Sequence, residues 1–116
     1  MMSMGPPTNE DAQLMLQLAQ WGTALGIEDA TAEILSESFD PQTAEPMANA
    51  SVRKLLMYCE SIGTLTKHGL LSAQLVDDWL WIDGLWARLG PSALKLREHH
   101  GEPRLYENFE LMATGS

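Results

Sequence analysis

Apolar residues recur at intervals of three and four positions along most of this chain, which is the spacing of one face of an α-helix. The longest series consists of Val52, Leu55, Leu56, Cys59, Ile62, Gly63 and Thr66. No segment keeps the alternation of apolar and polar residues that is typical of a half-buried β-strand. The spacing therefore predicts an all-α protein, an antiparallel helical bundle of five to six helices with short loops.

Glycine, proline and capping residues predict where these helices begin and end. Thr8 or Asn9 is the expected N-cap of the first helix. Pro91 either opens a separate helix or kinks a longer one. Gly63 lowers helix propensity inside an apolar face, which predicts that another helix approaches closely there. The predicted helices are residues 9–25, 28–38, 46–68, 73–90, 91–100 and 103–113.

The length of 116 residues fits a single domain, which can fold without a disulfide or a structural metal. Residues 1–8 are predicted to form a disordered tail, and residues 9–113 a single helical domain. Within that domain we expect an acidic helical hairpin over residues 9–40 and a main bundle over residues 46–113.

The net charge of −9 comes from the first part of the chain. Residues 1–50 contain eight acidic residues and no lysine or arginine, whereas residues 51–116 contain eight acidic and seven basic residues. Binding to nucleic acid or to an anionic membrane needs a basic face, so neither is expected. The acidic part is compatible with a basic protein partner. Alternatively, its carboxylates only solvate exposed helix faces.

The single cysteine, Cys59, cannot form a disulfide within the chain, which favours a cytoplasmic protein over a secreted one. The first residues lack the basic and apolar regions of a signal peptide. No apolar run approaches the roughly 18 to 20 residues that a membrane span needs. We therefore expect a cytoplasmic protein that does not enter a membrane.

The segment "VDDWLWIDGLWARLG", residues 76–90, contains three of the four tryptophans. If it is one helix, Trp79 and Trp86 lie almost one above the other on the core face. Trp81 and Leu80 then point elsewhere. Another helix of this chain covers Trp81, or its indole lies flat on the surface near Arg88, or it belongs to an interface with another molecule.

Four residues lie off the core faces of their predicted helices and are candidate interface residues: Trp81, Leu80, Met57 and Leu16. They predict a protein that acts by protein–protein contact, with homodimerisation as one form of that contact. One alternative is an acidic mimic of nucleic acid that inhibits a basic protein. Another is a small-ligand-binding or enzymatic domain without a recognisable motif.

Arg97 projects from the apolar side of its predicted helix. A buried guanidinium needs a partner, and Glu110 or Glu60 could supply the carboxylate. The alternative is that Arg97 extends along the surface and keeps its charge in water. A buried pair would have a structural role rather than a catalytic one.

No catalytic, cofactor-binding or metal-binding motif occurs in the sequence. Cys59 lies on a core face, where a cysteine behaves as a small apolar residue. His68, His99 and His100 lie at the ends of predicted helices and lack the spacing of a metal site. We therefore expect neither enzymatic activity nor a cofactor or metal.

Two stretches, "LLMYCESIGTLTKHGLLSAQLVDDWL" and "WARLGPSALKLREHHGEPRLYENFELMA", carry a resemblance to a known family. Residues 52–113 resemble an uncharacterised group of small bacterial all-helical domains of unknown function, some of which are anchored in membranes. The residues that match its pattern are Glu60, Arg97, Tyr106, Phe109 and Glu110. The resemblance implies an all-helical fold and no particular activity, and it leaves the acidic first part of the chain outside the match.

Overall fold

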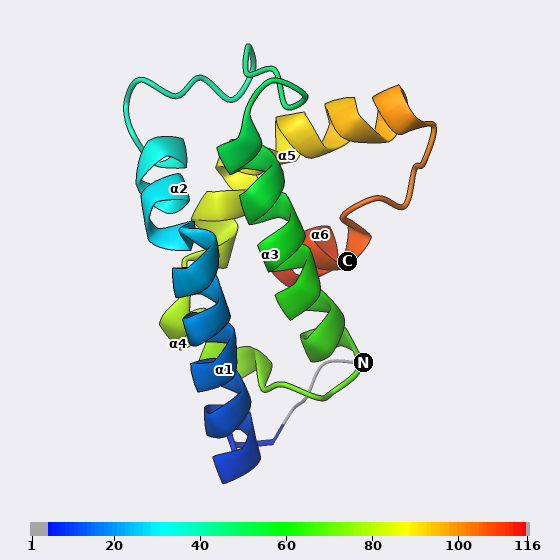
Figure 1. Cartoon of the computed structure of the whole chain (residues 1–116). Coiled ribbons are helices and arrows are strands. Elements are labelled where there is room, and N and C mark those ends of the chain that lie inside the picture. The colour runs from blue at the N-terminus through cyan, green and yellow to red at the C-terminus, as the bar shows by residue number, and fades with distance from the viewer. Residues whose placement is uncertain (1–4, 116) are drawn as a thin grey trace.

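Six helices make up the computed structural model of this protein, which describes residues 5–115 (Figure 1). They are α1 (Asn9–Leu25), α2 (Ile27–Ile34), α3 (Ala50–Lys67), α4 (Ala73–Trp79), α5 (Ile82–His100) and α6 (Glu107–Thr114). Residues 5–115 contain no β-strand, so the predicted all-α bundle is confirmed. Part of the predicted tail, residues 1–4, lies outside the described residues.

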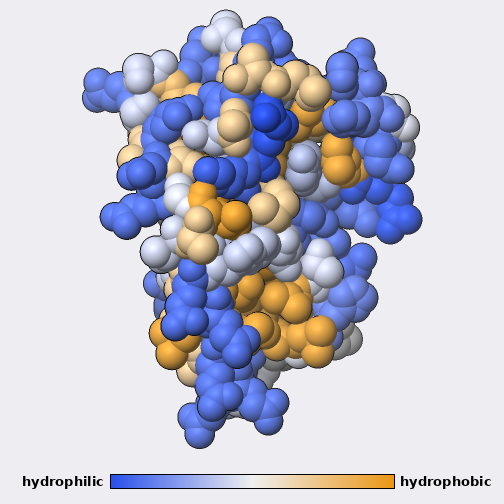
Figure 2. Space-filling view, in the orientation of Figure 1, coloured by the Kyte–Doolittle hydropathy of each residue, from blue (hydrophilic) through white to orange (hydrophobic). Residues whose placement is uncertain are grey.

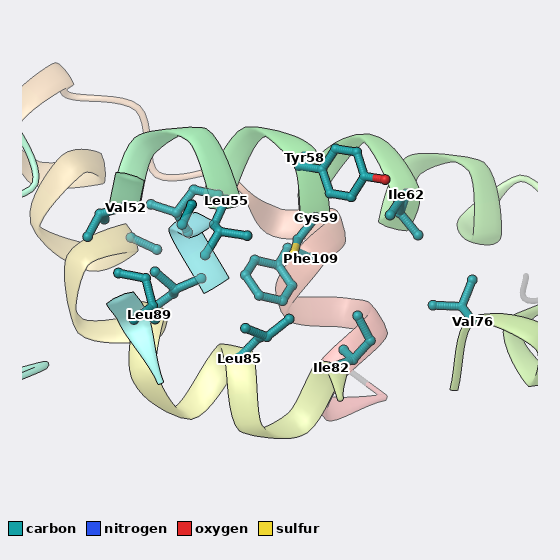
Figure 3. Packing of buried hydrophobic residues seen from close by; sticks show 14 of the residues in the cluster. Val52, Leu55, Tyr58, Cys59, Ile62, Val76, Ile82, Leu85, Leu89 and Phe109 are labelled. Carbon is teal, nitrogen blue, oxygen red and sulfur yellow. The ribbon is translucent and has the colours of Figure 1, made fainter. Parts of the chain in front are cut away.

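The core forms around α3, which runs through the middle of the molecule (Figure 1). α2, α5 and α6 pack against α3, and its apolar face is fully buried. Leu85, Leu89 and Phe109 from the other helices belong to the same buried cluster as Val52 and Leu55 of α3 (Figure 3). Full burial of each such side chain stabilises the fold by about 1.5–3 kcal/mol.

The N-terminus of α1 is held by a reciprocal cap. The Thr8 hydroxyl accepts from the Asp11 backbone N–H, and the Asp11 carboxylate accepts from the Thr8 N–H at 2.8 Å. The second Asp11 oxygen accepts from the Ser72 N–H at 2.9 Å, which ties α1 to the start of α4. These hydrogen bonds, the Thr8 backbone donor first, lower the pKa of Asp11.

Gly26 joins α1 to α2 with a left-handed backbone, φ 75°, and is both the C-cap of α1 and the N-cap of α2. In Figure 1, α2 extends beyond the end of α1 and does not fold back along it. The prediction of a helical hairpin over residues 9–40 is therefore wrong, because a one-residue junction leaves too little chain for an antiparallel return. α2 also ends at Ile34.

The loop between α2 and α3 is fastened to the bundle by three basic side chains. Arg53 donates to the Pro46 and Met47 carbonyl oxygens at 2.7 and 2.8 Å, and Arg88 donates to a further carbonyl of the loop. Lys95 donates to two more loop carbonyls. These bonds satisfy carbonyl groups that no helix uses.

α5 is one helix that contains Pro91, so the alternative of a kinked longer helix is the one that the structure shows. Figure 1 shows α5 changing direction near its middle, as expected where proline removes a backbone donor. α3 and α6 begin later than predicted, at Ala50 and Glu107. None of the helices in residues 5–115 is both long and apolar enough to cross a lipid bilayer.

Gly63 lets α6 lie directly against α3, so the predicted close approach is confirmed. A Cβ at Gly63 would be 2.5 Å from the Asn108 carbonyl oxygen and 3.0 Å from the Phe109 nitrogen. Phe109 is fully buried in the core at this point. The missing side chain therefore allows the backbone of α6 to reach the position that buries Phe109.

Candidate functional site

The tryptophan segment is not one helix, so the single-helix prediction for residues 73–90 is wrong. α4 ends at Trp79, Leu80 is extended, and α5 begins at Ile82. Between them, Trp81 has φ −81° and ψ 74°, and the Ile82 N–H donates to the Leu80 carbonyl at 2.9 Å. This is an inverse γ-turn. The corner lets Val76 and Ile82 both be buried, each from its own helix.

Trp81 is 68% exposed, so no other described part of this chain covers it. Its indole lies against the first turn of α5, where a Cβ at Gly84 would overlap the ring. Arg88, the predicted stacking partner, donates instead to the Phe39 carbonyl at 2.9 Å. Glycine at position 84 therefore lets a large aromatic ring lie flat on a helix backbone with much of its surface in solvent.

Two adjoining hollows, of about 590 and 190 Å³, lie beside this corner. The residues that line both are Ile27, Thr31, Tyr58, Trp79 and Leu80, from α2, α3 and the α4–α5 corner. We call the combined depression the tryptophan groove. The smaller hollow also reaches Cys59 and Trp81. The lining of the groove is mainly apolar and aromatic, which is common at sites that bind ligands or proteins.

Tyr58 is a fixed part of the lining of the groove. Its hydroxyl donates to the Leu18 carbonyl oxygen, and its ring packs at a tilt against Trp21, with centroids 5.2 Å apart. A Cβ at Gly22 would be 2.7 Å from the hydroxyl oxygen, so glycine leaves room for the phenol. Burial raises the pKa of Tyr58 to about 12, which keeps the phenol neutral near pH 7.

Cys59 lines the smaller hollow, but its thiol is not suited to nucleophilic chemistry. The residue is buried, and this burial raises the pKa of its thiol to about 12. The nucleophile is the thiolate, so almost none of it is present near pH 7. Cys59 therefore contributes an apolar wall to the groove.

Carboxylates border the tryptophan groove on two sides. Glu28 and Asp29 line the larger hollow where α2 begins. Asp77 and Asp83 line a separate, polar hollow of about 250 Å³, which also includes Leu80 and Trp81. Leu80 and Trp81 therefore separate the apolar groove from an acidic hollow, and we call these four carboxylates the acidic rim.

The other two candidate interface residues do not join Leu80 and Trp81 in the groove. Met57 is 37% exposed and lines a different hollow of about 460 Å³, together with Glu60 and Tyr106. Leu16 is 59% exposed on α1. The structure thus brings two of the four predicted interface residues into one site.

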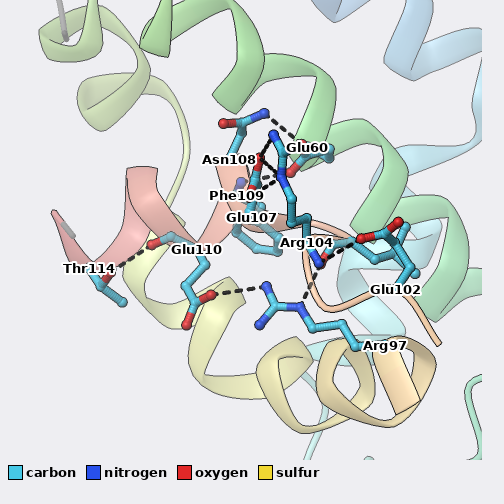
Figure 4. Close-up of polar contacts among 10 residues, drawn as sticks. Glu60, Arg97, Glu102, Arg104, Glu107, Asn108, Phe109, Glu110 and Thr114 are labelled. Carbon is cyan, nitrogen blue, oxygen red and sulfur yellow. Dashed lines mark hydrogen bonds and ion pairs between the residues drawn. The ribbon is translucent and has the colours of Figure 1, made fainter. Parts of the chain in front are cut away.

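The predicted pairing of Arg97 with Glu110 is present (Figure 4). Arg97 Nη2 lies 2.9 Å from Glu110 Oε1, and Nε donates to the Leu105 carbonyl at 2.6 Å. The Arg97 side chain is mostly buried, so it does not extend along the surface into water. These bonds hold α6 and the turn before it against α5, which is a structural role.

Glu60, the other predicted partner of Arg97, caps α6 instead (Figure 4). Its carboxylate accepts from the Phe109 backbone N–H at 2.8 Å and from Asn108 Nδ2 at 2.9 Å. An acidic group at a helix N-terminus satisfies free N–H groups and favours the helix dipole. α6 has no cap from its own N-cap residue, Tyr106, whose φ is 62°.

The histidines lie at helix ends, as predicted. His68 is the C-cap of α3, and the rings of His99 and His100 meet edge to face at the end of α5, 4.9 Å apart. Within residues 5–115, no group of three or more histidine, cysteine or acidic side chains could hold a metal ion.

Sequence reasoning did not single out Gly22, Gly84 or Tyr58 as parts of a site. The available signal was a glycine within a predicted helix close to aromatic residues, since such a glycine often allows close approach of another group. That signal was used for Gly63 but not for the tryptophan segment.

Comparison with protein families matches residues 8–116 to a domain of unknown function, DUF4760. Searches of curated proteins and of solved structures returned no match. The match includes the acidic residues 9–40, so the expectation that they lie outside the family resemblance is wrong. The resemblance to an uncharacterised family is confirmed and extends over nearly the whole sequence. The chain belongs to the DUF4760 family of domains of unknown function.

Proposed function

We propose that this domain acts by binding another protein through the tryptophan groove, and not by catalysis. The observation that supports this best is Trp81, which is 68% exposed and held flat over Gly84 beside an apolar hollow. Tryptophan is highly buried on average, and at interfaces it often contributes more binding energy than other residues. A tryptophan fixed in this position is ready to bind without a large ordering cost.

The chemistry of the groove favours binding over catalysis. The phenol of Tyr58 and the thiol of Cys59, which both lie in its lining, have a pKa raised to about 12 by burial. An efficient acid or base has a pKa near the working pH. The lone buried cysteine also fits the cytoplasmic location that we propose for the domain.

The acidic-mimic alternative receives less support. It needs unpaired carboxylates along one exposed face, but Glu33 of α2 accepts from Asn49 Nδ2 at 3.1 Å and from the Ser51 hydroxyl at 3.2 Å. Apolar contact through Trp81 would also weaken little in salt, unlike contact between a mimic and a nucleic-acid-binding face.

Site-specific photo-crosslinking tests the proposed function. We expect p-benzoylphenylalanine in place of Trp81 to give a discrete cross-linked protein in cells, because the side chain faces the bound partner. The matched control replaces Leu94, an apolar residue of α5 that is 56% exposed and outside the groove. Equal products at both positions, or none at either, would contradict the proposal.

Light scattering at two protein concentrations shows whether the bound protein is a second copy of this chain. If the measured mass of the wild type rises with concentration and that of Trp81→Ala stays at the monomer value, the chain self-associates through the groove. A constant mass, together with a cross-linked product at position 81, identifies a different protein. A truncated interfacial tryptophan commonly costs about 2 kcal/mol, or roughly thirtyfold in affinity.

Gly84→Ala moves Trp81 without removing it. The new Cβ would overlap the indole and force it off the helix, so we expect weaker binding. Alanine raises helix propensity by about 0.8–1.0 kcal/mol relative to glycine, which partly offsets any strain within the variant. The affinity for the protein that cross-links at position 81, or for a second copy of this chain, is measured, and circular dichroism checks that the variant is folded. Full affinity in a folded Gly84→Ala protein would show that the placement of Trp81 is not used.

A further inference from the structure

We propose that the tryptophan groove receives a cationic amphipathic helix of a different protein. This inference rests on the protein-binding function proposed above and names the chemistry of the partner. Its apolar side chains enter the groove, and its lysine or arginine side chains meet the acidic rim.

The shape and lining of the groove favour a helix as the bound segment. Residues 5–115 contain no strand whose edge could pair with an extended peptide. The groove is walled by helices and by the α4–α5 corner, and it offers the side chains of Trp79, Leu80 and Ile27. An amphipathic helix binds such a surface through residues spaced three and four apart, whose side chains share one face.

The charge beside the groove favours a basic partner. Glu28 and Asp29 lie at one side, and Asp77 and Asp83 lie in the hollow on the far side of Leu80 and Trp81. Among the residues that line or adjoin the groove within residues 5–115, the basic group is Lys54, whose Nζ is 3.7 Å from the position that a Cβ would take at Gly26. Four carboxylates against one ammonium leave a negative surface around an apolar centre.

A second copy of this chain fits the same surface poorly. The chain carries a net charge of −9 and seven basic residues. Five of these already donate to acceptors in their own chain: Arg53, Arg88, Lys95, Arg97 and Arg104. The hydrogen bond from Arg104 lowers the pKa of the Glu107 carboxyl most, and the charge of Lys67 lowers it further. Two copies would therefore bring their acidic rims together, with Lys54 of each copy as the basic group that remains near them.

The test measures binding of two synthetic helices to the full chain by fluorescence anisotropy. Each fluorescein-labelled peptide has about 16 residues, with leucines spaced three and four apart to form one apolar face. One peptide has lysines beside this face, and the other has glutamates at the same positions. We expect the lysine peptide to bind at least about tenfold more tightly, and its advantage to shrink as salt is raised.

Two charge-matched double variants locate the electrostatic contribution. Glu28→Gln with Asp29→Asn removes two carboxylates at the groove, and we expect it to weaken the lysine peptide about threefold to tenfold. Glu10→Gln with Glu98→Gln removes the same charge elsewhere, from exposed positions in α1 and α5. Equal weakening by both pairs would show that only net charge matters and would overturn the inference.

The remaining outcomes separate this inference from the proposed function. If the glutamate peptide binds as well as the lysine peptide, the partner is not selected by charge and the inference is wrong. If neither peptide binds but light scattering shows self-association that Trp81→Ala abolishes, the occupant is a second copy, and only the protein-binding function stands. If cross-linking at position 81 fails as well, both proposals are wrong.

Discussion

At the scale of single residues, glycines opposite aromatic rings shape the tryptophan groove. Gly84 lets the Trp81 indole lie on α5. A Cβ at Gly22 would be only 2.7 Å from the Tyr58 hydroxyl oxygen, so glycine leaves room for the phenol there. Any larger residue at either position must displace the ring. The placement of the Trp81 and Tyr58 rings in the groove therefore requires glycine at positions 84 and 22.

The ionisation of Cys59 gives a prediction at this scale. Its thiol has a pKa of about 12 in the folded protein, above the ordinary value of 9.0. A raised pKa contributes stability that is fully present below pH 9.0 and is lost as pH rises from there toward 12, because only the unfolded chain ionises. We expect this contribution to fall by about 1 kcal/mol by pH 10.

The measurement is urea unfolding of the wild type and of Cys59→Ala at pH 8 and pH 10. Alanine has no thiol to ionise, so the free energy of unfolding should drop less in the variant between these two pH values. An identical drop in both proteins would show that the thiol is accessible in the folded state.

At the scale of helices, the sequence predicts ends that carry local signals and misses the corner that does not. Gly26 ends α1, Gly63 marks the approach of α6, and the all-α fold follows from apolar spacing. Leu80 and Trp81 carry no glycine, proline or capping signal, and the helical spacing continues across them. Tertiary packing decides that α4 stops there, and no local pattern records it.

Of the two polar contacts that hold α6, one could be predicted from the sequence and the other could not. The pair of Arg97 with Glu110 was predictable because a buried guanidinium requires a carboxylate. The capping of α6 by Glu60 was not, because it depends on where an element far along the chain is placed. The groove likewise combines residues from α2, α3 and the α4–α5 corner, whose meeting cannot be read from spacing alone.

Gly63→Ala tests the docking of α6. The added Cβ would lie 2.5 Å from the Asn108 carbonyl oxygen, so α6 must move and Phe109 loses its place in the core. Overpacking commonly costs about 1–3 kcal/mol, which exceeds the gain of up to about 1 kcal/mol in helix propensity. We expect a net loss of up to about 2 kcal/mol in the free energy of unfolding, measured in urea.

Ser61→Ala on the same helix is the control, since its hydroxyl donates to the Met57 carbonyl of its own helix. We expect it to change the free energy of unfolding by less than about 0.5 kcal/mol. A Gly63→Ala protein at least as stable as the wild type would contradict the close packing of α3 and α6.

At the scale of the whole molecule, most of the basic side chains donate to acceptors of their own chain, while the carboxylates of the acidic rim face outward. Arg53, Arg88 and Lys95 fasten the loop between α2 and α3, and Arg97 fastens α6. The net charge of −9 comes mainly from residues 1–50, which contain eight acidic residues and no lysine or arginine. Such a surface attracts basic partners and repels a second copy.

The most direct test of the central claim is to map binding on the four indole N–H signals by nuclear magnetic resonance. The signals are assigned with single Trp→Phe variants, and the lysine peptide is then added. We predict shifts for Trp79 and Trp81, which line the groove, and little change for Trp86, whose ring packs edge-on against Phe109 with centroids 5.0 Å apart. A shift of Trp86 as large as that of Trp81, or no shift at Trp79 and Trp81, would contradict the account.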